Sequence, residues 1–154
     1  MAKYTSTKLF DGYSTVFRQW KAEDTHCRFL HGYAISFRVW FEGELDHRNW
    51  VWDFGGMKRS KTQINGMSPK DYFTWLLDHT TVIAMDDPHL ESFKQLSSEG
   101  LIQLRIIPAT GCEKFAEHLY TKINTFLKEE TEGRVKAIKV EVYEHEKNSA
   151  SYGQ

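Results

Sequence analysis

The stretch HCRFLHGYAISFRVWFEG, His26 to Gly43, decides the fold because it contains the clearest strand pattern of the chain. The odd positions from Tyr33 to Phe41 are apolar, whereas most of the even positions between them are small or polar. A period of two is typical of a strand with one buried face. We expect this strand to pair with an N-terminal strand between Lys8 and Trp20, a segment rich in Thr, Tyr, Val and Phe.

The rest of the sequence predicts further strands and helices. In chain order they are the end of a hairpin strand at Trp50 to Phe54 followed by the start of a helix, a short helix from Ser68-Pro69 to about Asp78, a short strand from Leu101 to Ile107, a long helix from Cys112 to Glu130, and a last strand from Lys136 to Glu144 with Ile138, Val140 and Val142 on one face. This order favours an α+β fold with helices on one face of an antiparallel sheet. Self-association is one way to cover the other face.

The composition indicates one globular domain over residues 1–154, since a chain of 18.1 kDa is large enough for a substantial core. The formal charge of -1 and the pI near 6.7 give no basic footprint for nucleic acid or anionic lipid. The N-terminal residues lack the apolar run of a signal peptide, and no segment has the length of a membrane span, so we expect a cytoplasmic protein. In that compartment both cysteines are expected to be free thiols.

Cys27 and His31 are the first candidates for chemistry. His31 and Tyr33 are two residues apart at the start of a strand, so their side chains share one face, as a histidine pair that grips a metal would. Cys27 has His26 and Arg28 beside it. A nearby cation would lower the pKa of the thiol and make it a nucleophile or base, whereas the alternative is a small buried hydrophobe.

Three carboxylates complete the candidate set. Asp78 precedes His79 just beyond a predicted helix, and a carboxylate near an imidazole can fix its tautomer and favour its protonated form. The alternative is that both are ordinary surface residues. Glu144 shares the parity of Val140 and Val142, so we expect a buried carboxylate that pairs with a cation or binds an N–H-rich ligand. Glu113 suits the first turn of the long helix by its charge alone.

Five segments, in this order, resemble the 6-pyruvoyltetrahydropterin synthase and 6-carboxytetrahydropterin synthase family over about Phe17 to Tyr152. They are Cys27-Arg28-Phe29-Leu30-His31-Gly32-Tyr33, Asp53-Phe54-Gly55-Gly56-Met57-Lys58, Leu77-Asp78-His79, the looser match Gly111-Cys112-Glu113-Lys114-Phe115-Ala116, and Val140-Glu141-Val142-Tyr143-Glu144. No single segment is specific, but their order and spacing together are.

The resemblance implies the tunnelling fold, a four-stranded antiparallel sheet with two main helices on one face. Subunits of this fold join their sheets into a trimeric barrel and usually stack as hexamers. The resemblance also implies that Glu144 anchors a pterin ring, with help from Cys112 and Glu113 at the start of the long helix. It further implies that Cys27 acts as a general base on the substrate side chain and that Asp78 and His79 relay a second proton.

Zinc is the cofactor that the resemblance implies, but the residues depart from the family's three-histidine set. Only His31 remains, because Tyr33 replaces the last histidine and the first-strand position falls near Trp20 or Lys21. A neutral phenol is a poor ligand at pH 7. His26 is a possible substitute ligand, and Lys21 and Arg28 are possible substitutes for the positive charge of the metal.

Two functions follow from these residues. The first is a lyase that acts on 7,8-dihydroneopterin triphosphate or a related pterin, in the manner of the tetrahydrobiopterin or queuosine pathways. The alternative is a catalytically silent paralogue that binds a pterin or purine-like ligand, or an oligomeric interaction protein. Neither function calls for a nucleic acid or a membrane as a partner.

Overall fold

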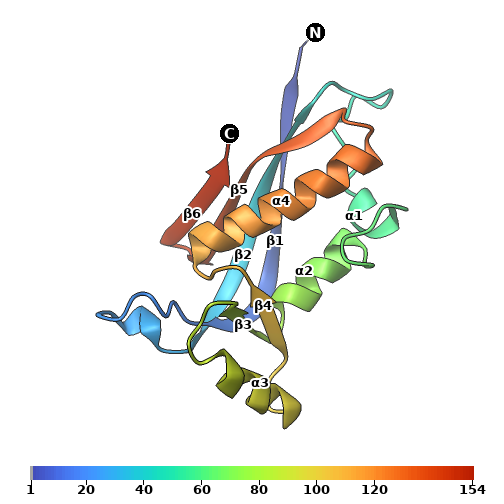
Figure 1. The fold of residues 1–154 in the computed structure, drawn as a ribbon. Helices are drawn as coiled ribbons and strands as arrows, with labels where there is room; N and C mark the ends of the chain where they lie inside the picture. Colours follow the sequence, from blue (N-terminus) through green and yellow to red (C-terminus); the bar gives the residue numbers. More distant parts are fainter. Residues whose placement is uncertain (1) are drawn as a thin grey trace.

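The structure is a computed structural model that describes residues 2–154 as a curled sheet with helices packed against it (Figure 1). The elements in chain order are β1 (Tyr4–Phe17), η1 (His26–Arg28), β2 (His31–Gly43), α1 (Gly56–Arg59), α2 (Pro69–Leu77), β3 (Thr80–Ala84), α3 (Leu90–Ser98), β4 (Leu104–Ile107), α4 (Cys112–Glu130), β5 (Val135–His145) and β6 (Asn148–Gly153). The α+β class and the tunnelling fold predicted from the sequence are confirmed.

The sheet has the strand order β4-β3-β1-β2-β5-β6. The four strands β1, β2, β5 and β6 pair antiparallel, as predicted, whereas β3 and β4 add to the edge of β1 in parallel. The predicted number of four strands is therefore wrong, because the described residues form six. All five residues of β3 are buried, so this strand lacks the alternation that reveals a half-buried strand.

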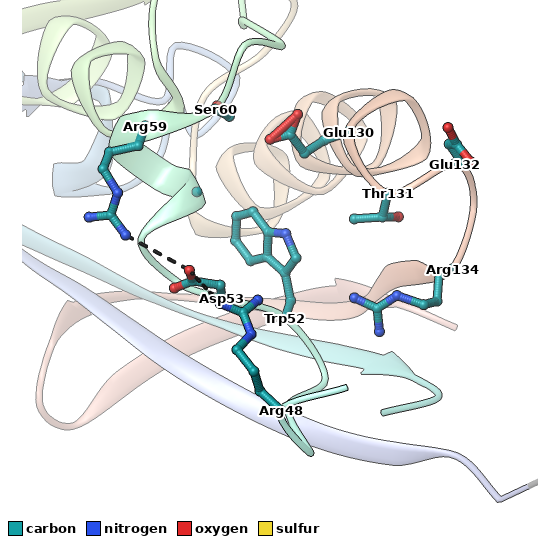
Figure 2. Close-up of a pocket in the computed structure, with 10 residues that line it drawn as sticks. Arg48, Trp52, Asp53, Arg59, Ser60, Glu130, Thr131, Glu132 and Arg134 are labelled. Atoms are coloured by element: carbon teal, nitrogen blue, oxygen red, sulfur yellow. Dashed lines mark hydrogen bonds and ion pairs between the residues drawn. The ribbon is translucent and has the colours of Figure 1, made fainter. Parts of the chain in front are cut away.

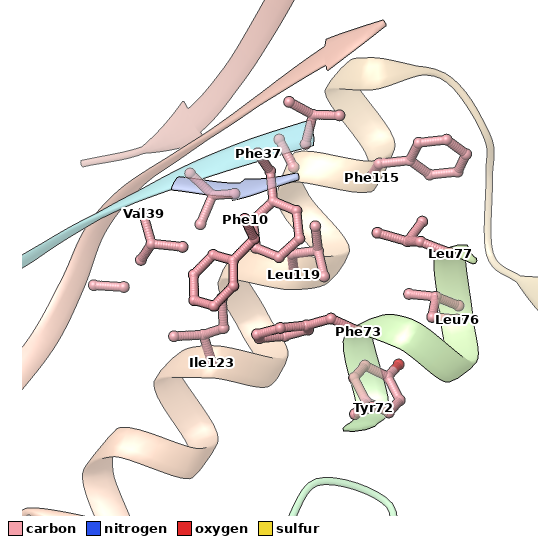
Figure 3. Close-up of a cluster of buried hydrophobic side chains, with 14 of the residues drawn as sticks. Phe10, Phe37, Val39, Tyr72, Phe73, Leu76, Leu77, Phe115, Leu119 and Ile123 are labelled. Atoms are coloured by element: carbon pink, nitrogen blue, oxygen red, sulfur yellow. The ribbon is translucent and has the colours of Figure 1, made fainter. Parts of the chain in front are cut away.

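Helices α2 and α4 cover one face of the sheet, and the aromatic core lies between them and the strands (Figure 3). Phe37 of β2 stacks on Phe10 of β1 with a ring-centroid distance of 4.9 Å, and Phe73 of α2 meets it edge-on at 5.0 Å. The apolar stripe of α4 supplies Leu119 and Ile123 to the same core. This packing fixes the direction of both helices relative to β1 and β2.

Two predicted elements need correction. The run Trp50 to Phe54 is a loop and not a strand end, because Trp52 packs against Phe41 at 5.5 Å and Phe126 at 5.9 Å without joining the sheet. In β5, Val140 and Val142 are fully buried as predicted, but Ile138 is not. The pairing with β2 shifts register at this point, and the bulge leaves Ile138 as the extra residue, so the alternation changes phase.

The other predicted elements are confirmed with small shifts at their ends. The long helix has the predicted bounds, and the N-terminal strand lies a few residues earlier than predicted, at Tyr4–Phe17. The short helix begins at Pro69 behind Ser68, whose hydroxyl accepts a hydrogen bond from the Asp71 N–H at 3.2 Å. Strand β3 and helix α3 are additions that the sequence patterns did not predict, whereas β6 pairs with the last predicted strand, β5. No helix within residues 2–154 is long and apolar enough to cross a membrane.

Candidate functional site

Cys27 lies in η1, a short 3-10 turn that follows β1. The Thr25 hydroxyl accepts a hydrogen bond from the Cys27 N–H at 3.1 Å, and the Gln19 N–H donates to the Cys27 carbonyl at 2.8 Å. These bonds fix the turn against the end of β1. The thiol is free and partly exposed, so reagents and ligands can reach it.

A buried ion pair between Arg18 and Asp87 stabilises the same turn. Arg18 donates from Nε and Nη2 to the two carboxylate oxygens of Asp87, both at 2.8 Å, and its Nη1 reaches the Arg28 carbonyl at 3.1 Å. Burial alone would raise the pKa of Asp87, but the hydrogen bonds from Arg18 and from the His89 N–H outweigh it and hold that pKa below its usual range. No pattern in the sequence indicated this pair.

Tyr33 lies at the centre of the predicted site residues. Its ring stacks on Phe17 at 4.3 Å and contacts the His31 ring at 4.4 Å. Burial raises the pKa of the Tyr33 phenol to about 12, and the nearby charges of Glu144, Cys27 and Cys112 act in the same direction. These three groups are therefore near enough to act on one phenol, which is protonated at neutral pH.

Glu144 lies near the end of β5, two residues after buried Val142 and at a register shift in the pairing with β6, and its charge acts on Cys112 at the start of α4. Its side chain is 25% exposed, and Oε1 accepts a hydrogen bond from Asn148 Nδ2 at 3.0 Å. Burial raises the pKa of Cys112 to about 12, the charges of Glu144 and Glu113 add to this effect, and a hydrogen bond from the Glu144 backbone opposes it. Cys112 is thus a buried thiol in the first turn of α4, whereas Glu113 beside it is exposed.

Asp78 and His79 form a hydrogen-bonded couple elsewhere. His79 Nδ1 lies 3.1 Å from Asp78 Oδ1, which also accepts from the Ser14 N–H at 3.0 Å. The hydrogen bond from the Ser14 N–H is the main reason that the pKa of Asp78 lies below its usual value, and the hydrogen bond to His79 adds to it. The His79 backbone has φ 58°, and its imidazole is 76% exposed.

The couple and the Tyr33 group lie on different faces of the sheet. His79 lines a surface cavity with Ser14 and Val16, which alternate along β1 with the buried residues Thr15 and Phe17. Tyr33 stacks on Phe17 and so lies on the helix-covered face. A single copy therefore brings Cys27, His31, Cys112, Glu113 and Glu144 to one end of the helix-covered face, and does not bring Asp78 and His79 there.

The surroundings of His31 do not fit a three-histidine metal site. Its Nδ1 lies 3.0 Å from the Phe29 carbonyl oxygen, and the Tyr33 phenol is protonated. Trp20 and Lys21, at the place of the missing first-strand ligand, both contact Asp86. Across residues 2–154 no group of three or more His, Cys, Asp or Glu side chains is placed to hold a metal ion.

A polar cavity of about 550 Å³ lies at the other end of the sheet, beside the C-terminus of α4 (Figure 2). Asp53 accepts from Arg48 at 3.3 Å and lies 3.8 Å from Arg59, and Arg134 donates to the Val51 carbonyl at 2.7 Å. Asp53 also accepts from the Gly55 N–H at 2.8 Å, just before α1. Arg48, Asp53 and Arg134 of this cavity thus already bond within the fold.

The sheet, the two covering helices and the glutamate at the end of β5 define a tunnelling-fold protein. The chain belongs to the 6-pyruvoyl tetrahydropterin synthase family, whose model matches residues 10–154.

Solved structures show the same fold. An uncharacterized protein from Wolinella succinogenes is 20% identical, with a TM-score of 0.77 over 100% of this chain and 99% of that one. The 6-pyruvoyl tetrahydropterin synthase of Caenorhabditis elegans is 19% identical, with a TM-score of 0.64 over 100% and 97%, and that of Plasmodium vivax is 15% identical, with a TM-score of 0.61 over 98% of both chains. No curated protein matches the sequence.

Proposed function

We propose that the protein binds a pterin beside Glu144 and acts as a lyase on the side chain of 7,8-dihydroneopterin triphosphate or a related pterin. Family membership supports the pterin synthase-like function. The observation that carries the proposal is the position of Glu144, a three-quarters buried carboxylate next to Cys112 and Tyr33, on the same face as Cys27. A partly buried carboxylate is stabilised by additional N–H donors, and the edge of a pterin supplies several beside the one from Asn148.

Glu144 and the turn of Cys27 have different tasks in this proposal. The carboxylate accepts hydrogen bonds from the pterin ring and so fixes its orientation. Cys27 then removes a proton from the side chain of the substrate, for which its partly exposed thiol must lose its own proton. Tyr33 closes the floor of the site with a neutral phenol that can donate one hydrogen bond.

Asp78 and His79 return the second proton. Asp78 holds the Nδ1 side of the imidazole, which leaves Nε2 to exchange a proton with the substrate. Since this couple lies on the other face of the sheet from Tyr33, we infer that it serves a site completed by a second copy of the chain. A trimer-based oligomer supplies such a neighbour, either as a trimer or as a hexamer of two stacked trimers.

Zinc remains a prediction from the family. Since the donors near His31 do not fit the three-histidine set, we assign no step to a metal. Lys21 is paired with Asp86 at 3.7 Å, and Arg28 is stacked on Phe29 at 4.6 Å, so either cation would have to leave its present contact to assist the substrate.

Pterin binding is tested with Glu144→Gln and the matched control Glu141→Gln. Both carboxylates are on β5 and similarly buried, with side chains 25% and 21% exposed, but Glu141 has the opposite parity. We expect fluorescence titration with a reduced pterin to show binding to the wild type and to Glu141→Gln only. Equal affinity for the wild type and Glu144→Gln would refute the assigned anchor.

Turnover is tested by mixing subunits. Cys27→Ala and His79→Gln proteins should each be inactive on dihydroneopterin triphosphate, and oligomers reassembled from both should regain part of the activity if two copies share each site. Activity of Cys27→Ala equal to that of the wild type would remove Cys27 from the mechanism. Absence of regained activity in demonstrably mixed oligomers would remove the shared site.

The second candidate function is a silent pterin- or purine-binding protein. It is favoured by one observation, the replacement of a family metal ligand by Tyr33 with a pKa of about 12. Binding that depends on Glu144 without turnover of any dihydropterin triphosphate would select this function.

A further inference from the structure

Another cavity, of about 450 Å³, lies near the middle of β1 and differs in its charge balance from the polar cavity beside the C-terminus of α4. Three lysines from three elements line it: Lys8 of β1, Lys58 of α1 and Lys70 of α2. Within residues 2–154 none of these ammonium groups lies within 4.0 Å of a carboxylate. Asp11 also lines the cavity but makes no ion pair there. We call this site the lysine cavity.

The direction of Lys8 makes the cluster unusual. Lys8 has the same strand parity as Phe10, so it projects from the face that the helices cover, and it is half-buried. Its Nζ lies 5.6 Å from the centroid of the Phe10 ring and 5.7 Å from that of Phe54. The cavity therefore combines a cationic rim with an aromatic wall.

The three cations act on one another. Contact with Lys58 lowers the pKa of Lys70, its charge and that of Lys8 add to the effect, and Asp71 opposes it. Lys70 is also in the first turn of α2, a nine-residue helix whose N-terminus adds partial positive charge. A bound anion would relieve this repulsion, since phosphate oxygens accept hydrogen bonds from several ammonium groups at once.

We propose that the lysine cavity binds the phosphate groups of a small phosphorylated metabolite, with the aromatic wall of Phe10 and Phe54 against its organic part. Lys8 and Phe17 are separated along β1 by about 30 Å at the usual rise of a strand. The lysine cavity is therefore distinct, within one copy, from the group around Tyr33. It makes no use of Cys27 or Glu144.

The site is tested by calorimetric titration of tripolyphosphate into the wild type and into Lys58→Gln/Lys70→Gln. Lys94→Gln/Lys128→Gln removes the same net charge from the exposed faces of α3 and α4 and is the matched control. We expect the cavity variant to bind at least about tenfold more weakly. We expect the control variant to bind like the wild type.

Thermal unfolding checks that the cavity variant is folded. Without ligand its Tm should equal or exceed that of the wild type, because two repelling charges are gone. Tripolyphosphate should raise the Tm of the wild type and the control, and not that of the cavity variant. Equal affinities in the two double variants, or no binding to the wild type, would overturn the proposal.

Two further probes define the ligand class. Guanosine triphosphate should bind the wild type at least as tightly as tripolyphosphate if the aromatic wall contributes. A single-stranded oligonucleotide that binds more tightly than either, and loses affinity in the cavity variant, would refute a small-molecule site in favour of a nucleic-acid surface.

Discussion

Replacing Asp87 by asparagine tests whether the buried ion pair holds the turn that carries Cys27. The Asp87 side chain is 1% exposed and that of Arg18 is 17% exposed, and two hydrogen bonds of 2.8 Å join them. Asparagine keeps the size but removes the charge, so Arg18 loses its counter-ion in a largely buried place. Loss of one partner of a buried pair costs about 3–5 kcal/mol.

Because Arg18 retains some access to water, we expect the lower end of this range. A loss of about 3 kcal/mol in the free energy of unfolding lowers the Tm of a chain of this size by roughly 6–12 °C. Urea unfolding at neutral pH measures the same loss as a lower midpoint at unchanged slope. The control is Asp86→Asn, because Asp86 is 51% exposed and 3.7 Å from Lys21, and such surface pairs contribute about 0–1 kcal/mol.

The turn should loosen as well, since Arg18 also bonds to the Arg28 carbonyl. We expect the thiol of Cys27 to react faster with a disulfide reagent in Asp87→Asn, while buried Cys112 stays slow and serves as the internal control. The double replacement Arg18→Met/Asp87→Leu should recover most of the stability, because it leaves no unpaired charge. Equal losses for Asp87→Asn and Asp86→Asn, or no recovery in the double variant, would refute the reasoning.

Three further changes follow from the structure. Burial lowers the pKa of His118 from 6.5 to about 4, so between these pH values the unfolded chain binds more protons than the folded one. The free energy of unfolding, measured by urea titration, should therefore fall by about 3 kcal/mol as the pH is lowered through this window. His118→Gln should abolish that pH dependence. Gly111→Ala should lower the free energy of unfolding by about 1–3 kcal/mol, because φ is 111° and the new Cβ would lie 2.8 Å from the Gln19 Oε1. Gly133→Ala should lower it less in the same thermal unfolding assay, because φ is 82° but the space around the new Cβ is free. Lys21→His/Tyr33→His should create zinc affinity measurable by competition with a chelating dye; unchanged metal binding would contradict the proposed relation of this site to the family's zinc site.

The sequence predicted the elements whose burial is one-sided. The helix Cys112–Glu130 has its predicted bounds, because a 3.6-residue apolar period survives wherever one face of a helix packs. Strand β3 was missed for the opposite reason, since Thr80–Ala84 is buried on both sides and has no period to detect. The bulge at Ile138 was missed because it depends on the partner strand, and no local residue pattern requires it.

The sequence could select the residues that gather near Tyr33, but it could not give the geometry of the candidate site. Strand parity and motif order selected Cys27, His31 and Glu144, and the fold brings these near Tyr33 because β1, β2 and β5 are neighbours in one sheet.

The side of the sheet on which His79 lies depends on how the chain leaves α2. After Asp78 the backbone of His79 is left-handed, and the chain then enters β3, which runs parallel to β1. The local sequence around Asp78 and His79 does not indicate this path of the chain, which has a functional consequence. If Asp78 and His79 act on a pterin held by Glu144, as we propose, they can reach it only across a subunit boundary, so the proposed catalysis requires assembly. Dilution below the dissociation constant of the oligomer should then abolish turnover while pterin affinity per subunit persists. Full turnover by isolated monomers would contradict the assignment of His79.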